Sequence, residues 1–258
     1  MKNIITNEQR LWDSLMQMGE IGGTEKGGCC RLALTDLDKQ ARDLFTRWCE
    51  EAGCTVRVDK MGNVFARRPG KNNDLPPVVM GSHIDTQPTG GKFDGVYGVL
   101  SGLEVIRTLN DHNIETDHPV EASIWTNEEG SRFAPAMVAS GVFAGVFDLE
   151  YGLSRADLDG KTMGEELQRI GYAGEHEVGS PVKAFFEAHI EQGPVLEEEF
   201  KSFVGMNPIP IVHGLTFGEF ATMLNGQGWL ANGVQCKLEV IKMLNYEHGK
   251  PYISPVPP

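Results

Sequence analysis

The sequence predicts an α/β protein in which helices flank a layered sheet. Apolar runs rich in β-branched residues alternate with segments whose apolar residues recur at helical spacing. Three of the apolar runs stop at a histidine or at a pair of acidic residues, which is typical of the ligand-binding edge of an open α/β sheet. With 258 residues and 40% hydrophobic composition, the chain can form the core of one ordinary domain and part of another.

Two helices and a hairpin are predicted before the first of these runs. Apolar residues at helical spacing predict a short helix over 7–18. A second helix is predicted over 35–53, because a threonine with an aspartate three residues later resembles a capping box and a glycine ends the pattern. Alternating residues over 55–59 and 64–68, separated by a Met-Gly-Asn turn, predict two strands of a hairpin.

The central strand is predicted over 78–86, and it ends in a His-x-Asp sequence. A neutral imidazole such as His83 is a good zinc ligand, and Asp85 can accept the proton of its other ring nitrogen. A glycine-rich loop then places Asp94 before a predicted buried helix over 96–109, and its two oxygens can bridge two ions. The alternative interpretation makes His83 an ordinary strand-end histidine and Asp94 a helix cap.

A further strand is predicted over 120–127, and it ends in the pair Glu128 and Glu129. Adjacent carboxylates at a strand end repel each other, so this arrangement favours a nearby cation or a proton on one of them. One carboxylate can then bind metal while the other acts as a base. A solvated acidic turn is the alternative interpretation of the pair.

The third strand is predicted over 182–188, and it runs into His189 shortly before a Gly-Pro turn. Before it, a threonine cap and a glycine stop predict a helix over 163–170. Since the carboxyl ends of parallel strands meet at one edge of a sheet, His83, Glu129 and His189 are expected to lie near one another.

The charge and cysteine content exclude several classes of protein. Thirty-six acidic against 23 basic residues give a net charge of −13, which argues against a nucleic acid or an anionic membrane as partner. No signal peptide or membrane span is apparent. The five cysteines form no C-x-x-C motif, which fits reduced thiols and predicts a cytoplasmic protein.

Four motifs stand out in the first 200 residues: GSHIDT at 81–86, GKFDG at 91–95, TNEEGSRF at 126–133 and EAHIEQGP at 187–194. Together they resemble those of the N-carbamoyl-L-amino-acid hydrolase, allantoate amidohydrolase and β-ureidopropionase family. The family consists of dinuclear metal amidohydrolases related to the aminoacylase and carboxypeptidase clan. The resemblance implies a three-layer, metallo-aminopeptidase-like sheet with flanking helices.

The resemblance also implies a reaction and a set of site residues. The reaction is hydrolysis, by a metal-bound water, of a linear amide or ureido C–N bond in an N-carbamoyl-L-amino acid, allantoate or ureidopropionate. Two Zn²⁺ ions per site are implied, with Mn²⁺, Co²⁺ or Ni²⁺ as alternatives. The implied roles are metal ligation for His83, Asp94, Glu129 and His189, with Asp94 bridging the ions, general-base catalysis for Glu128, orientation of His83 by Asp85, and a polar substrate contact for Gln192.

The sequence changes character after about residue 200. Residues 203–258 resemble a fragment of the exo-N-acetylmuramidase family of peptidoglycan-degrading proteins, chiefly through the His-Gly-Leu-Thr sequence at 213–216 and the Gly-Glu pair at 218–219. Two segments are therefore expected. Residues 1–200 would form the N-terminal half of a dizinc amidohydrolase catalytic domain, and 201–258 an unrelated, truncated α+β tail.

This division has consequences for function. The family is homodimeric and supplies a histidine for the second metal from a later part of its chain, and no counterpart of the dimerisation domain or of that histidine is found here. Metal binding with reduced or absent turnover of a small ureido or carbamoyl substrate is therefore expected. Two alternatives remain open: an inactive fused or truncated metal-binding remnant, and a fragment of a peptidoglycan glycosidase.

Overall fold

The computed structural model describes residues 4–190 and 237–239, and its centre is a mixed sheet. The strands lie in the order β1-β2-β4-β3-β5-β6. The three middle strands β4, β3 and β5 are parallel to one another, while β2 runs antiparallel to β4 and joins β1 in the predicted hairpin. The strands are β1 Thr55–Val58, β2 Val64–Arg68, β3 Val78–His83, β4 Val120–Trp125, β5 Ala184–His189 and β6 Lys237–Glu239.

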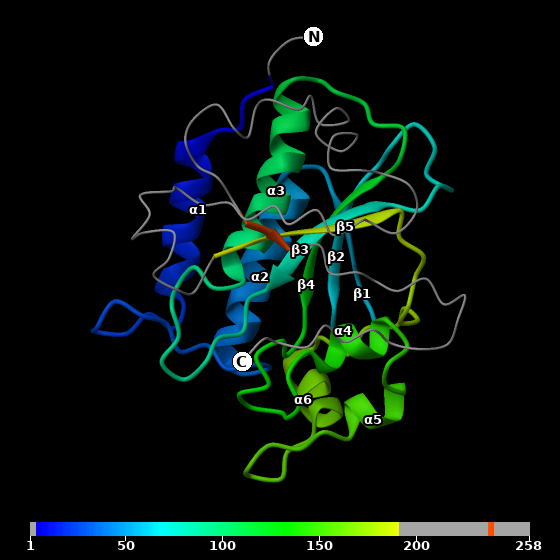
Figure 1. Cartoon of the computed structure of the whole chain (residues 1–258). Helices are drawn as coiled ribbons and strands as arrows, with labels where there is room; N and C mark the ends of the chain where they lie inside the picture. The colour runs from blue at the N-terminus through cyan, green and yellow to red at the C-terminus, as the bar shows by residue number, and fades with distance from the viewer. Residues whose placement is uncertain (1–3, 191–236, 240–258) are drawn as a thin grey trace.

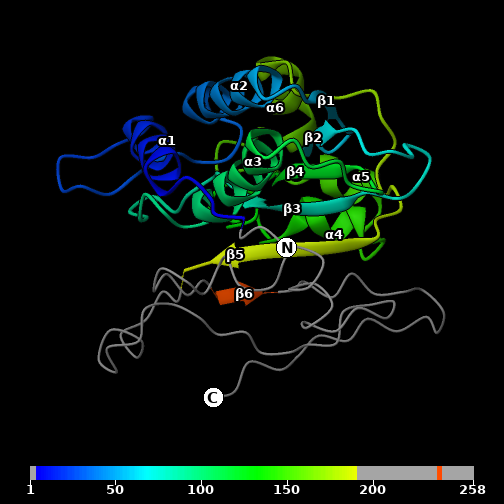
Figure 2. The same cartoon turned by 90° about the horizontal axis from the view of Figure 1, so that it is seen from above.

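Helices pack against the sheet as the alternation of elements predicts. Figure 1 shows α1 and α3 side by side, with α3 nearer the strands, and α4, α5 and α6 grouped at the lower end of the view. Figure 2 shows α2 over the β1–β2 side of the same sheet. The helices are α1 Glu8–Glu20, α2 Asp36–Glu51, α3 Val96–Asp111, α4 Val138–Phe143, α5 Leu149–Leu153 and α6 Met163–Ile170.

The two faces of the sheet bury different side chains. On the α3 face, alternate residues of the strands join the large core that also holds the apolar side of α2 and α3. On the opposite face, an aromatic cluster joins the sheet to α4: Phe65, Val79, Trp125, Phe143 and Phe185. Burial on both faces is what near-continuous apolar strands predict, and it confirms the mixed α/β sheet.

The helix ends follow the predicted cap residues, with one difference. Thr162 and Glu165 form a full capping box at the start of α6, and Gly171 ends that helix. Thr35 accepts a hydrogen bond from the backbone N–H of Asp38 at the start of α2. The carboxylate of Asp38, however, accepts from the backbone N–H of Leu34 at 2.7 Å, one residue further back than a capping box requires.

Most of the predicted tail lies outside the described residues. The boundary at residue 200 and the predicted α+β character of 201–258 cannot be compared with the structure beyond β6. This short strand pairs antiparallel with β5 and extends the same sheet. Among the described residues, none of the helices has the length and apolar character needed to cross a bilayer.

Candidate metal centre

The parallel strands β3, β4 and β5 end at one edge of the sheet and place their polar residues together. His83 is the last residue of β3 and lies beside Trp125, the last residue of β4, in the parallel register. Glu128 and Glu129 follow three and four residues later, and His189 is the last residue of β5. The strand register therefore explains why residues far apart in the sequence meet here.

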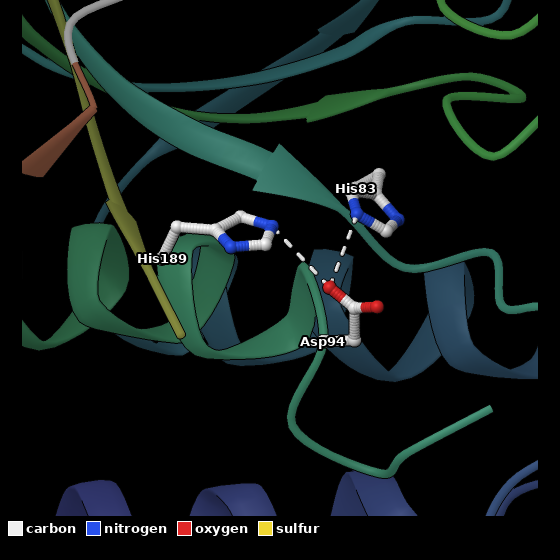
Figure 3. A group of neighbouring side chains, drawn as sticks. All are labelled: His83, Asp94 and His189. Atoms are coloured by element: carbon white, nitrogen blue, oxygen red, sulfur yellow. Dashed lines mark ion pairs between the residues drawn. The ribbon is translucent and has the colours of Figure 1, made fainter. Parts of the chain in front are cut away.

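Three of the predicted ligands form a compact group. His83, Asp94 and His189 each offer a ligand atom, and these atoms all lie within 4.8 Å of one another. The Oδ1 atom of Asp94 lies 3.3 Å from Nε2 of His189 and 3.9 Å from Nε2 of His83. Figure 3 shows the carboxylate of Asp94 between the two imidazole rings. His83 is buried and His189 is half-buried, so the group is largely shielded from solvent.

A glycine places Asp94 against His83. Gly95 follows Asp94 with a φ of 66°, a conformation that favours glycine, and a Cβ there would lie 2.5 Å from the ring of His83. Gly95 is the N-cap residue of α3, and that helix has no side-chain cap hydrogen bond. The N-cap position that the alternative interpretation gave to Asp94 is thus occupied by Gly95.

Asp85 contacts both His83 and the turn that carries the two glutamates. The Nδ1 atom of His83 lies 2.8 Å from the backbone carbonyl oxygen of Asp85, whereas the Asp85 carboxylate is 3.8 Å away. The carboxylate instead accepts the backbone N–H groups of Glu128 and Glu129 at 3.1 and 3.2 Å. The sequence assigned the orientation of His83 to the Asp85 side chain. In the structure the backbone of Asp85 orients His83, and the side chain holds the turn that carries the two glutamates.

The two glutamates point into the site with different partners. Oε2 of Glu128 lies 3.5 Å from Nε2 of His83, the same nitrogen that faces Asp94. Oε2 of Glu129 accepts a hydrogen bond from Gln87 at 3.1 Å. The other oxygen of Glu129, Oε1, is buried and has no hydrogen-bond partner among the described residues. A buried carboxylate oxygen without a donor favours a cation as its missing partner.

Several acidic side chains and both histidines of the site have raised pKa values. Burial raises the pKa of Asp85 to about 6, and it also raises the pKa values of Glu128 and Glu129. The hydrogen bond to Asp94 raises the pKa of His189 to about 9. Burial lowers the pKa of His83, but the charges of Asp85 and Glu128 outweigh it and leave that pKa raised.

Sequence reasoning missed one acidic residue of the site. Glu187 is buried on β5, two residues before His189, and accepts a hydrogen bond from the hydroxyl of Ser82. Burial raises its pKa to about 7. A glutamate within an apolar strand, at the two-residue spacing that places it on the same face as His189, was the available signal. Gln192, the predicted substrate contact, lies outside the described residues.

The donor set fits a divalent transition metal. Two imidazole nitrogens and carboxylate oxygens are the ligands that zinc prefers in catalytic sites. Nδ1 of His83 lies 2.8 Å from the backbone carbonyl oxygen of Asp85, and Nδ1 of His189 likewise lies 2.8 Å from that of Ile190. Such contacts fix the tautomer and leave Nε2 free to bind metal.

Two family models match parts of the chain. The model described as Peptidase family M28 matches residues 63–150, which hold β3, α3 and β4. The model described as "Exo-beta-N-acetylmuramidase NamZ, N-terminal" matches residues 184–258, from β5 to the end of the chain. The first match lies within the segment that resembles the amidohydrolases, and the second covers the tail at 203–258 but begins 19 residues before it.

Individual relatives match the first part of the chain more closely. An N-carbamoyl-L-amino-acid amidohydrolase of Rhizobium meliloti is 60% identical over 201 residues, covering 78% of this chain and 48% of the relative. A ureidoglycolate hydrolase of Arabidopsis thaliana is 37% identical over 180 residues, covering 66% and 38%. The crystal structure of an amidase of the hydantoinase/carbamoylase family from Burkholderia multivorans has a TM-score of 0.77 and 71% identity, covering 78% and 49%.

These comparisons confirm the resemblance to the carbamoyl amidohydrolases over about the first 200 residues. They also show that the chain spans about half the length of the curated relatives it matches.

Proposed function

We propose, from its similarity to N-carbamoyl-L-amino-acid amidohydrolases, that the chain holds a metal centre that hydrolyses a linear amide or ureido C–N bond. The observation that carries the proposal is the group of His83, Asp94 and His189 at the ends of parallel strands, with Glu128 next to it. These three residues would hold one ion. Asp94 and Glu129 would contribute to a second, since Glu129 keeps a buried oxygen without a hydrogen-bond partner among the described residues.

The bound metal would supply Lewis-acid chemistry, polarising the scissile carbonyl and lowering the pKa of the attacking water. Zinc fits the donor set best, and Mn²⁺, Co²⁺ and Ni²⁺ accept the same ligands. The protein would provide the remaining parts of the reaction.

Glu128 would act as the general base and then as the general acid. Its raised pKa suits a group that accepts a proton from water and later donates it to the departing nitrogen. Asp85 would hold Glu128 in place, because its carboxylate accepts the backbone N–H of Glu128. Mispositioning of such a base by about an ångström is costly to the rate.

N-carbamoyl-L-amino acids are the first substrate class that we propose, because that activity is printed for the relative with 60% identity. Ureidoglycolate is the second candidate, because a ureidoglycolate hydrolase with 37% identity also covers this part of the chain. Both carry a ureido group, so release of ammonia reports on either reaction.

The test measures metal content and turnover on the purified full chain. Wild type is expected to bind zinc, and His83→Ala is expected to lose at least one ion per chain. Glu128→Gln is the matched variant, because it should keep the metal while ammonia release from N-carbamoyl-L-amino acids or ureidoglycolate falls by roughly 10²-fold or more. Wild-type protein without bound zinc, or full turnover in Glu128→Gln, would contradict the proposal. Wild-type protein that binds zinc but releases no ammonia would also contradict it, and would favour the inactive metal-binding remnant instead.

A further inference from the structure

The two histidines of the site lie beyond the last backbone pair that β3 and β5 form with each other. The parallel ladder between β3 and β5 runs from Val78 and Ala184 to Met80 and Phe186. His83 and His189 each follow three residues after that last pair. Backbone pairing between the two strands therefore does not extend to the level of the ligands.

Helix α3 packs closely against β3 and β5 beyond the ladder that these two strands share. A Cβ on Gly98 would lie 2.6 Å from the backbone oxygen of Ala188 on β5 and 2.8 Å from the Cβ of Ser82 on β3. The first turn of α3, which follows Asp94, thus contacts the strand of each histidine. Since the shared ladder ends before this level, contacts other than β3–β5 backbone pairing hold the two strand ends together.

A buried side-chain hydrogen bond joins the strands at this level. The hydroxyl of Ser82, the residue before His83, donates to Oε1 of Glu187, two residues before His189. Ser82 is fully buried and Glu187 is 6% exposed, so water competes little for the bond.

We propose that Ser82 and Glu187 form a positioning pair that sets the separation of His83 and His189 for metal binding. The ring centroids of the two histidines are 6.4 Å apart. Each ring is oriented locally, because its Nδ1 atom lies 2.8 Å from a nearby backbone carbonyl oxygen. Those local contacts fix the ring planes, and the Ser82–Glu187 bond fixes the distance between the strands that carry them. The inference rests on the proposed metal centre.

The test is a double-mutant cycle on zinc affinity in the full chain. The variants are Ser82→Ala, Glu187→Ala and the double variant, and affinity is measured by competition with a chromogenic chelator. Each single change is expected to weaken zinc binding roughly tenfold or more, as loss of a partner outside the ligand set typically does. The double variant is expected to lose no more than the larger single loss, because both changes remove the same bond.

Two further variants separate positioning from a general loss of packing. Ser123→Ala removes a fully buried hydroxyl on the neighbouring strand β4 that has no hydrogen-bond partner among the described residues. It should leave zinc affinity unchanged. Glu187→Gln keeps an oxygen that can accept from Ser82, and it should retain more affinity than Glu187→Ala. The absorption spectrum of the Co²⁺-loaded protein, which reports coordination geometry, should change in Ser82→Ala and not in Ser123→Ala.

The outcomes distinguish this inference from the proposed function. If wild type binds zinc and Ser82→Ala binds it as tightly as Ser123→Ala does, the positioning pair is overturned while the metal centre stands. Additive losses in the double variant would likewise overturn the pair. A wild-type chain that binds no zinc would overturn both.

Discussion

Two regions of the molecule in which acidic residues gather balance their charge differently. The arginine-paired cluster joins α2, α6 and the loop after β4, and each of its acids has an arginine partner. The strand-end cluster, at the ends of β3, β4 and β5, has none within the part of the chain that the structure describes. The arginine-paired cluster consists of Asp38, Arg42, Arg132, Asp157, Glu166 and Arg169. The strand-end cluster consists of Asp85, Glu128, Glu129 and Glu187.

The pKa values follow this difference. Burial raises the pKa of Glu166, but hydrogen bonds from Arg169 and Arg132 outweigh it and leave that pKa below its usual value. In the strand-end cluster burial prevails, and the pKa of Glu187 rises to about 7. A cation site requires buried acids that have no arginine or lysine partner, because the bound metal then balances the charge that a basic side chain would otherwise balance. The comparison therefore separates acids whose charge arginines balance from acids whose charge no arginine in the described part of the chain balances.

The largest expected effect comes from removing a cation from the arginine-paired cluster. Arg42 and Asp38 form an ion pair at 2.9 Å in which both side chains are fully buried. Arg42→Met should lower the free energy of unfolding by about 3–5 kcal/mol, since it leaves the Asp38 charge buried without its ion-pair partner. Urea unfolding at pH 7.5 with a chelator measures the loss.

The exposed pair of Lys39 and Asp43 on the same helix is the control. Its ion pair has a similar length of 2.9 Å, but both side chains are about half exposed. Lys39→Ala should change the free energy of unfolding by about 0.5 kcal/mol or less. Equal losses in Arg42→Met and Lys39→Ala would show that burial does not distinguish the two pairs.

The second prediction concerns pH, and the two clusters should respond with opposite sign. Glu187 keeps its proton up to about pH 7 in the folded state, whereas an unfolded glutamate releases it near its ordinary pKa of 4.5. The metal-free protein should therefore lose about 3 kcal/mol of stability between pH 4.5 and 7 through this residue alone. Glu187→Gln should reduce that loss of stability. Urea unfolding at pH 5 and at pH 8, with a chelator present, measures the difference.

Glu166→Gln provides the matched change in the other cluster. The pKa of Glu166 is lowered, so its stabilising contribution is present above its unfolded pKa of 4.5 and is lost as the pH falls through the folded value. Glu166→Gln should thus destabilise the protein at pH 8, where Glu187→Gln stabilises it. If both variants changed the free energy of unfolding at pH 8 in the same direction, the proposed difference between the two clusters would be contradicted.

Sequence patterns predicted where the candidate ligands His83, Asp94 and His189 lie better than they predicted the arginine-paired cluster, for a physical reason. A strand places its last residue at a fixed edge, so the positions of His83 and His189 follow from where the apolar runs stop. The glycine-rich loop before α3 indicated Asp94 in the same way. Local chain geometry was sufficient for these three residues.

Contacts between distant elements were not predictable in this way. The pair of Ser82 and Glu187 depends on how β3 and β5 diverge beyond their last ladder pair, and no local pattern encodes that. Arg132 reaches Asp157 and Glu166 only because the loop after β4 folds back onto α6. The Asp85 carboxylate was assigned to its near neighbour His83, whereas it accepts from the backbone of Glu128, 43 residues away.

The smallest expected effect comes from giving the strand-end cluster a basic side chain of its own. Gln87 is exposed and donates a hydrogen bond to Oε2 of Glu129 at 3.1 Å. Gln87→Lys should place an ammonium group beside Glu129 and stabilise the metal-free protein by about 0.5–1 kcal/mol, the usual range for a partly exposed pair. Urea unfolding in chelator measures this gain.

The same change should weaken metal binding, because an ion has to displace the ammonium group from Glu129. A stabilisation near 1 kcal/mol corresponds to a roughly fivefold weaker zinc affinity. Gln87→Leu separates charge from the lost hydrogen bond, since it removes the donor without adding a cation. If Gln87→Lys strengthens zinc binding, or if both variants act alike, then Glu129 does not face the ion and the proposed ligand set is reduced to His83, Asp94 and His189.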